Sequence, residues 1–190
     1  SMLRSSARAF FIFTMFGMKN VAVLDGGIAK WKAEGRTVET GTREIPASNL
    51  PVPEAQNDRV RSKADMLANC DSREEQVVDA RDSGRFSAAV DDAVHGLAGG
   101  HIPGARNLHF VQLFTDEGTF KEPAAIRQLF ENAGLDLSKP ITGSCGSGMT
   151  ASVLLFALEL IGHDDTALYD GSWSEWGADP ETPKETGAAQ

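Results

Sequence analysis

The stretch that decides the fold reads Lys139-Pro-Ile-Thr-Gly-Ser-Cys-Gly-Ser-Gly-Met-Thr-Ala151. Its first half, residues 139–144, predicts a short β-strand, and the apolar run Thr150–Ile161 predicts a helix. Cys145 lies between them, just after the strand. Active sites of open α/β sheets form beyond the carboxyl ends of strands, so this position indicates a reactive cysteine rather than a core residue.

Helices and strands alternate on both sides of this stretch. Residues Ser62–Asn69 predict a short helix with Ser62 as its N-cap, and Ala124–Ala133 predict another that stops at a glycine. Short β-rich runs occupy Gln76–Asp79 and Ala105–His109. The alternation predicts an α/β fold, with a central parallel sheet covered by helices on both faces.

The loop that follows the predicted strand has the composition of an anion-binding cradle. Gly146 and Gly148 allow the backbone to curl and to point several N–H groups inward, and the next helix adds the positive end of its dipole. These groups favour a thiolate at Cys145 and would stabilise a persulfide anion there. Ser147 adds a hydroxyl group that could bond the sulfur or a leaving group.

Composition excludes several classes of function. The chain has 190 residues and a formal net charge of −9, with no basic stripe for nucleic acid or an acidic membrane surface. The apolar run Phe10–Phe16 is shorter than the roughly 20 residues that a membrane-spanning helix needs. Two cysteines, Cys70 and Cys145, make no disulfide framework, and the four histidines have no metal-ligand spacing. We therefore expect no metal, no cofactor, no nucleic acid and no membrane among its partners.

The chain contains an internal repeat. Residues 16–31 and 161–176 share five identities at a constant offset of 145 residues, and both predict a short strand, an Asp-Gly turn and a helix with a tryptophan. The repeat predicts that residues 1–45 are the end of a truncated first domain, although their composition also suits a mitochondrial transit peptide. The predicted organisation continues with a proline-containing linker at 46–61, a catalytic domain at 62–178 and a flexible tail at 179–190.

Four motifs carry a specific resemblance to the two-domain rhodaneses of the sulfurtransferase group. They are Val77-Val-Asp-Ala-Arg-Asp-Ser-Gly-Arg-Phe86, Gly100-His-Ile-Pro-Gly-Ala-Arg-Asn107, Cys145-Gly-Ser-Gly-Met-Thr-Ala151 and Tyr169-Asp-Gly-Ser-Trp-Ser-Glu-Trp176. The cysteine loop is similar to that of the 3-mercaptopyruvate sulfurtransferase branch. Thiosulfate sulfurtransferases typically have Arg-Lys where this chain has Gly146-Ser147.

The resemblance implies a mechanism and a set of site residues. Cys145 would take sulfur from 3-mercaptopyruvate, release pyruvate and pass the sulfur to thioredoxin, a low-molecular-weight thiol or cyanide. Ser147 would assist protonation of the departing enolate, and Arg85 would hold the substrate carboxylate. The loop residues Gly146, Gly148, Met149 and Thr150 would complete the substrate site.

Two departures from the family pattern bear on activity. A second carboxylate-binding arginine of the family falls at Val94, which cannot replace it; His95 is adjacent and could substitute, but we expect it to be an ordinary loop histidine. The first domain of the family also supplies an aspartate and a histidine to the cleft. The alternatives are therefore a thiosulfate sulfurtransferase and a weakly active or regulatory rhodanese-fold binding module.

Two further expectations concern a rival chemistry and the location. A phosphatase or arsenate reductase on this fold needs an arginine six positions after the cysteine, where this chain has Ala151. The acidic charge and the lack of a clear signal sequence predict a cytoplasmic or mitochondrial location.

Overall fold

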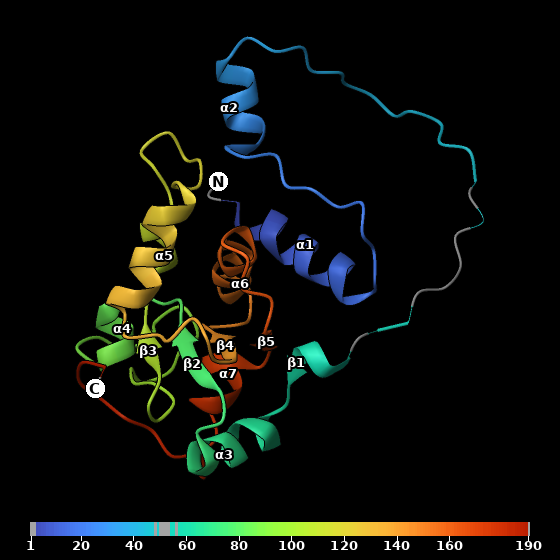
Figure 1. Cartoon of the computed structure of the whole chain (residues 1–190). Helices are drawn as coiled ribbons and strands as arrows, with labels where there is room; N and C mark the ends of the chain where they lie inside the picture. Colours follow the sequence, from blue (N-terminus) through green and yellow to red (C-terminus); the bar gives the residue numbers. More distant parts are fainter. Residues whose placement is uncertain (1–2, 48, 50–53, 56, 190) are drawn as a thin grey trace.

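A five-stranded parallel sheet forms the centre of the computed structural model, which describes residues 3–47, 49, 54–55 and 57–189 (Figure 1). The strands lie in the order β1-β5-β4-β2-β3. Their bounds are β1 Val60–Arg61, β2 Gln76–Asp79, β3 Arg106–Asn107, β4 Ile141–Ser144 and β5 Thr166–Tyr169. Every pairing between neighbours is parallel, which confirms the predicted fold class.

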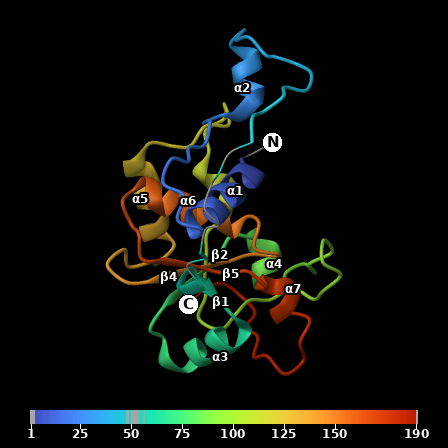
Figure 2. The ribbon, with the colours of Figure 1, turned by 90° about the vertical axis from the view of Figure 1, so that its right-hand side faces the viewer.

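Helices cover both faces of this sheet, and Figure 2 shows α1, α5 and α6 on the side opposite α3. The helices are α1 Arg4–Met15, α2 Gly27–Ala33, α3 Lys63–Ser72, α4 Ser83–Ser87, α5 Pro123–Asn132, α6 Ala151–Leu160 and α7 Ser172–Trp176; the short 3-10 turns are η1 Asn57–Arg59 and η2 Phe110–Leu113. Side chains alternate along the strands, so Val78 joins the core under α1, α5 and α6, whereas Val77 joins the core under α3, α4 and α7.

The order of the strands creates a topological switch point at their carboxyl ends. The chain passes from β2 to β3 on one side, and from β4 to β5 on the other, so β2 and β4 flank the point where the strand order reverses. Asp79 at the end of β2 is in register with Ser144 at the end of β4. Arg85, on α4, follows β2, and Cys145 follows β4, so both lie at the end of the sheet where ligands bind in this class of fold.

The N-terminal segment packs on the catalytic unit through α1. Ala7, Phe10 and Phe11 are buried, and the Phe10 ring meets Phe156 of α6 edge to face at 4.8 Å between centroids. The strand predicted within residues 16–31 is absent: residues 21–24 have no strand assignment. A strand needs a neighbour to satisfy its backbone groups, and no described strand lies beside this segment.

The predicted linker at 46–61 and the predicted flexible tail at 179–190 both contain ordered segments that pair with the rest of the structure. β1 lies inside residues 46–61, the predicted linker, because Val60 pairs with Leu168 at the sheet edge. Residues 179–190 are not a flexible tail over their described part, since the His101 and Glu185 backbones exchange two hydrogen bonds of 2.9 Å. The Gly187 N–H also donates to the Ser87 carbonyl at 2.8 Å. Pro51 and Pro53 of the predicted linker lie outside the described residues.

Candidate active site

Cys145 follows β4 directly and lies at the bottom of a loop that runs to α6. Its side chain is buried, with 1% of its surface exposed, whereas Ser147 and Met149 are exposed at the rim. Gly146 and Gly148 are buried and Thr150 is half-buried. Cys70, the other cysteine, lies on α3, and burial raises the pKa of its thiol.

Ser172 holds this loop in shape, and the sequence analysis did not identify it as a site residue. Its hydroxyl oxygen accepts hydrogen bonds from the N–H groups of Cys145 and Gly148, both at 3.1 Å, and donates to the Tyr169 carbonyl at 2.8 Å. Ser172 is fully buried and has a positive φ of 51°. The motif Tyr169–Trp176 was the available signal, because it places a hydroxyl group at the start of a helix beside β4.

The remaining loop amides are available to an anion. The N–H groups of Gly146, Ser147, Met149 and Thr150 donate to no acceptor among the described residues. The carbonyl of Gly146 is already occupied by the Ser174 N–H at 2.8 Å. The loop therefore offers hydrogen-bond donors and no free negative group of its own, which suits a thiolate or a persulfide.

A residue from the N-terminal segment reaches the same loop. The Arg8 guanidinium of α1 forms an ion pair of 2.8 Å with Asp170, which lies after β5. Gly148 has a φ of +74°, and a Cβ there would lie 2.5 Å from an Asp170 carboxylate oxygen. Only glycine fits this close approach. Arg8 was also missed by the sequence analysis, since its contact with Asp170 spans most of the chain.

Arg85 lies on α4, at the carboxyl end of the neighbouring strand, and is held by two carboxylates. Its Nε donates to Asp82 at 2.5 Å, and its Nη1 lies 3.4 Å from Asp92. The third nitrogen, Nη2, has no acceptor among the described residues. The Arg85 side chain is 21% exposed, so this nitrogen remains available for a carboxylate from outside the protein.

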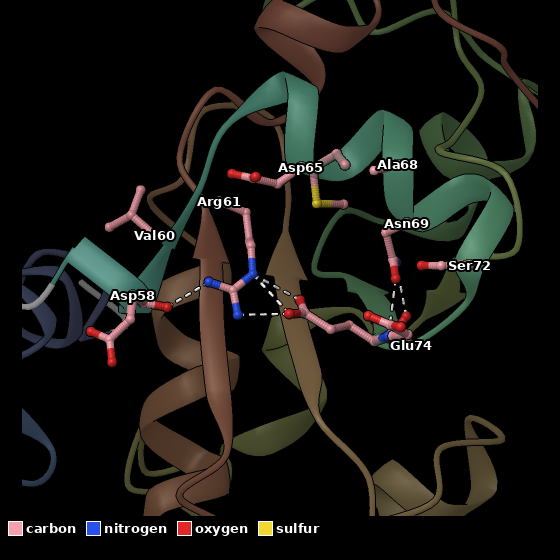
Figure 3. A pocket seen from close by; sticks show the side chains of 10 residues that line it. Asp58, Val60, Arg61, Asp65, Ala68, Asn69, Ser72 and Glu74 are labelled. Carbon is pink, nitrogen blue, oxygen red and sulfur yellow. Dashed lines mark hydrogen bonds and ion pairs between the residues drawn. The ribbon is translucent and has the colours of Figure 1, made fainter.

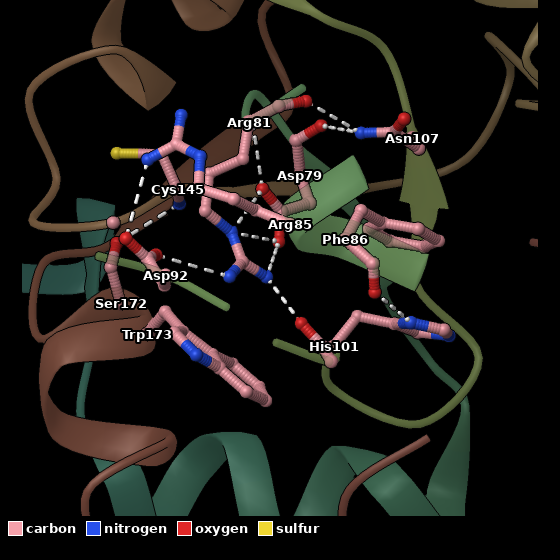
Figure 4. Close-up of polar contacts among 12 residues, drawn as sticks. Asp79, Arg81, Arg85, Phe86, Asp92, His101, Asn107, Cys145, Ser172 and Trp173 are labelled. Atoms are coloured by element: carbon pink, nitrogen blue, oxygen red, sulfur yellow. Dashed lines mark hydrogen bonds and ion pairs between the residues drawn. The ribbon is translucent and has the colours of Figure 1, made fainter. Parts of the chain in front are cut away.

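Below Arg85 lies a buried ion-pair network, which Figure 4 shows in contact with Trp173. Arg81 donates to both oxygens of Asp79 and to the Gly100 carbonyl, and its guanidinium lies 4.6 Å from the Trp173 ring centroid. Its Nη1 lies 3.4 Å from Asp92, which is fully buried. Asp92 therefore links the internal network to Arg85.

His95 departs from its expected role as an ordinary loop histidine. Its Nδ1 lies 2.9 Å from Asp92, and its ring lies so close to Gly146 that a Cβ there would be 2.1 Å from Cε1. Val94 instead points into solvent, with 76% of its surface exposed. A chain of contacts therefore links the arginine that follows β2 to the cysteine loop that follows β4. It runs from Arg85 through Asp92 and His95 to Gly146.

A surface hollow of ≈ 420 Å³ lies elsewhere, between β1 and α3 (Figure 3). Its rim is acidic, with Asp58, Asp65 and Glu74, and its arginine, Arg61, is paired with Glu75 at 2.6 Å. It contains no residue of the Cys145 loop, so it lies apart from the candidate nucleophile. In the described part of the chain, no cluster of three metal-ligating side chains occurs, and no helix could cross a membrane.

Comparison with known proteins gives matches over almost the whole chain. The model of the rhodanese-like domain family matches residues 62–179. The chain is 38% identical to mouse 3-mercaptopyruvate sulfurtransferase over 92% of its length, and 40% identical to chicken thiosulfate sulfurtransferase over 89%. It spans 58% and 57% of those two relatives, respectively, or somewhat less than three-fifths of each.

Solved structures give the same result. The 3-mercaptopyruvate sulfurtransferase SseA from Escherichia coli superposes with a TM-score of 0.77 at 36% identity, over 90% of this chain and 63% of that chain. EanB in a cysteine-persulfide form superposes with a TM-score of 0.84 at 25% identity, over 97% of this chain and 46% of that chain.

Proposed function

This chain belongs to the rhodanese-like domain family, and from that membership we propose that it is a sulfurtransferase that uses 3-mercaptopyruvate. The observation that carries the proposal is the placement of Cys145 beneath unpaired loop amides, with Arg85 linked to the same loop through Asp92 and His95. A nucleophile and a carboxylate anchor at the same end of the sheet fit a small anionic sulfur donor.

The proposed reaction has two steps at one sulfur atom. The Cys145 thiolate attacks the sulfur of 3-mercaptopyruvate, a new S–S bond forms, and the C–S bond breaks with its electron pair moving to the carbon of the pyruvate enolate. The thiol proton of the donor reaches the enolate carbon through the Ser147 hydroxyl, which gives pyruvate and leaves Cys145 as a persulfide anion. The Cys145 persulfide passes its outer sulfur to a thiol acceptor, which regenerates the cysteine.

In this scheme, the loop amides stabilise Cys145 first as a thiolate and later as a persulfide anion. The N–H groups of Gly146, Ser147, Met149 and Thr150 can stabilise the starting thiolate and then the persulfide anion. The Arg85 Nη2 would hold the donor carboxylate while the sulfur is transferred. A preformed set of donors costs no reorganisation at the moment of reaction, which is the contribution that a rigid loop can make.

The donor preference follows from the charge of the loop. Thiosulfate carries two negative charges, and Gly146 and Ser147 add no cation beside the cysteine. We therefore propose 3-mercaptopyruvate as the donor, and thioredoxin or a small thiol as the acceptor, with cyanide as a substitute acceptor. Thiosulfate remains the second candidate, because a thiosulfate sulfurtransferase is 40% identical to this chain.

The proposed domain organisation is a catalytic unit at residues 62–178, preceded by the end of another rhodanese-like unit at 1–45. The packing of α1 on α6 and the Arg8–Asp170 ion pair support a stable association between these two parts. A cytoplasmic or mitochondrial location also stays a prediction.

Turnover with two donors tests the proposal. The purified chain is supplied with 3-mercaptopyruvate or with thiosulfate, together with a thiol acceptor, and sulfide and pyruvate are followed. We expect 3-mercaptopyruvate to be the faster donor. The Cys145→Ser variant should abolish turnover, and the matched Cys70→Ser variant should retain it. Equal rates for the wild type and Cys145→Ser would exclude the proposed nucleophile.

A further inference from the structure

The N-terminal helix α1 places a cation beside the cysteine loop. Nη1 of Arg8 lies 2.8 Å from Oδ1 of Asp170, the residue that follows β5. Nη1 is buried, and its approach to Asp170 is an ion-pair contact rather than an aligned hydrogen bond. A Cβ on Gly148 would lie 2.5 Å from the same Asp170 oxygen and 3.4 Å from Arg8 Nη1. The loop backbone at Gly148 therefore packs directly against both charges.

Gly148 lies close to the nucleophile because the two residues share a hydrogen-bond acceptor. The N–H groups of Gly148 and Cys145 both donate to Ser172 Oγ, at 3.1 Å each. Two donors that bond one oxygen atom lie close together. The Asp170 carboxylate, which lies against Gly148, is therefore near enough for its charge to act on charge at the cysteine.

Asp170 would oppose a negative sulfur at Cys145 if its charge were not cancelled. A thiolate and a persulfide are both anions, and a like charge nearby destabilises either one. In the described part of the chain, Arg8 is the cation that pairs with Asp170. The buried network around Arg85 has no guanidinium group in excess, because three carboxylates contact two guanidinium groups there: Asp79, Asp82 and Asp92 against Arg81 and Arg85.

We propose that Arg8 is a positioning residue for Cys145: it holds and neutralises Asp170, and so permits a negative sulfur in the cysteine loop. The inference rests on the proposed function, and it adds the docking of α1 as a requirement for a reactive nucleophile. Arg8 acts on the sulfur through Asp170 and needs no contact with the donor in this role. The two side chains are 23% and 50% exposed, respectively, so solvent screens their charges in part.

Alkylation of Cys145 measures the effect without a sulfur donor. In a Cys70→Ser parent, Cys145 is the single thiol. Its rate of reaction with iodoacetamide, a neutral reagent, is measured at a pH where the parent rate still rises with pH, so that it follows the thiolate.

Two replacements of Arg8 separate its charge from its packing. Arg8→Met removes the charge and keeps an unbranched side chain beside Phe11, whose ring centroid lies 6.0 Å from Arg8 Cζ. At low salt we expect Arg8→Met to slow alkylation by roughly fivefold. Arg8→Lys should remain close to the parent, because it keeps a cation for Asp170.

A change at the carboxylate distinguishes a charge effect from lost packing. Asp170→Asn in the Arg8→Met background should restore the alkylation rate to within about twofold of the parent, because it removes the charge that Arg8 no longer cancels. Added salt should reduce the loss in Arg8→Met, since these partly exposed charges are screened. Arg4→Met is the matched control: Arg4 is an exposed cation one turn earlier on α1, and its loss should leave the rate unchanged.

The outcomes separate this inference from the proposed function. Equal alkylation rates in every protein, a double variant as slow as Arg8→Met, or a loss that salt does not change would overturn the role of Arg8. The assay contains no 3-mercaptopyruvate, so the proposed function then stands if the wild type still turns that donor over. If the wild type shows no turnover while alkylation follows the predicted order, the role of Arg8 stands and the proposed function fails.

Discussion

At the scale of single residues, the cysteine loop depends on one buried hydroxyl group. Ser172 Oγ accepts from two loop amides, Cys145 and Gly148, although its residue belongs to the turn after β5. The loop also relies on close approaches that only glycine permits, at Gly146 beside His95 and at Gly148 beside Asp170. These contacts leave the other loop amides free to bond the sulfur. Two N–H groups therefore fix the shape of the loop, and the others can stabilise charge on Cys145.

Replacement of Ser172 by alanine should remove the hydrogen-bond acceptor that holds the cysteine loop in shape. Two buried N–H groups would lose their acceptor, which costs about 1–3 kcal/mol of unfolding free energy. Activity should fall as well, since the loop loses its fixed shape. Urea unfolding and kcat/KM measure the two effects. Ser174→Ala is the matched control: it removes the hydroxyl bond from Ser174 to the Gly146 carbonyl, but the Ser174 N–H still donates there and no loop amide loses its acceptor. Equal effects of both changes would contradict the role given to Ser172.

At the scale of elements, the sequence predicted features that depend on residues close together in the chain and missed features that depend on contacts between distant segments. The capping box of Ser62 and Asp65 at the start of α3 confirms the predicted N-cap, and β4 and α6 lie close to their predicted bounds. Such signals lie within a few residues of each other. The strand predicted at residues 16–31 failed because the pattern could not show whether a neighbouring strand exists. The contact between His95 and Gly146 spans some fifty positions and had no local signal.

Residues 180–189 should behave as a docked segment. The His101 and Glu185 amides donate to each other's carbonyls, and the Trp176 indole N–H donates to the Pro183 carbonyl at 2.7 Å. Hydrogen exchange followed by mass spectrometry should therefore show slower exchange in a peptide covering residues 180–189 than in one covering 36–47, which is exposed. Equally fast exchange in both peptides would support the flexible tail predicted from the sequence.

Helix α1 should contribute to the stability of the catalytic unit. Phe11 is 4% exposed in the core that α1 shares with α6, whereas Phe13 on the same helix is 46% exposed. Phe11→Ala should lower the free energy of unfolding by about 3–5 kcal/mol, and Phe13→Ala by far less. Denaturant unfolding of both variants measures this difference. If Phe11→Ala were as mild as its control, α1 would not be part of the cooperative unit.

At the scale of the whole molecule, the site is assembled where the strand order reverses. Asp79 is the last residue of β2, and Arg81 and Arg85 follow it. Cys145 follows β4, and the segment before β3 contains Asp92 and His95. The sequence predicted the two strand ends and therefore the end of the sheet at which the site lies. It could not predict Asp92 as the common partner of three side chains, because that role depends on how distant segments pack.

Stability should decrease in acid. Hydrogen bonds from Ser62 lower the pKa of Asp65, and the ammonium group of Lys63 lowers that of Asp179. Burial raises the pKa of Asp82 and Asp92, but contacts with Arg85 lower that of Asp82 on balance, and contacts with His95 and Arg85 lower that of Asp92. A carboxyl with a lowered pKa in the folded state stabilises the protein above its unfolded pKa of about 4, and this stabilisation disappears as the pH falls through the folded value.

Urea unfolding from neutral pH down to about pH 3 measures this effect. Glu159, whose pKa is raised by burial, acts in the opposite direction and should offset only part of the loss. An Asp82→Asn variant should be less sensitive to pH over this range than the wild type. An unfolding free energy that stays constant or rises toward acid would contradict the predicted ion-pair contributions.

The mass of the protein after exposure to the donor tests the central claim most directly. The chain is incubated with 3-mercaptopyruvate without an acceptor, and intact mass and peptide mapping locate any added sulfur. We predict a gain of one sulfur atom on Cys145, present in Cys70→Ser and absent in Cys145→Ser, which a thiol acceptor then removes. No added sulfur, or sulfur carried on Cys70 instead, would contradict the account of Cys145 as the sulfur-carrying nucleophile.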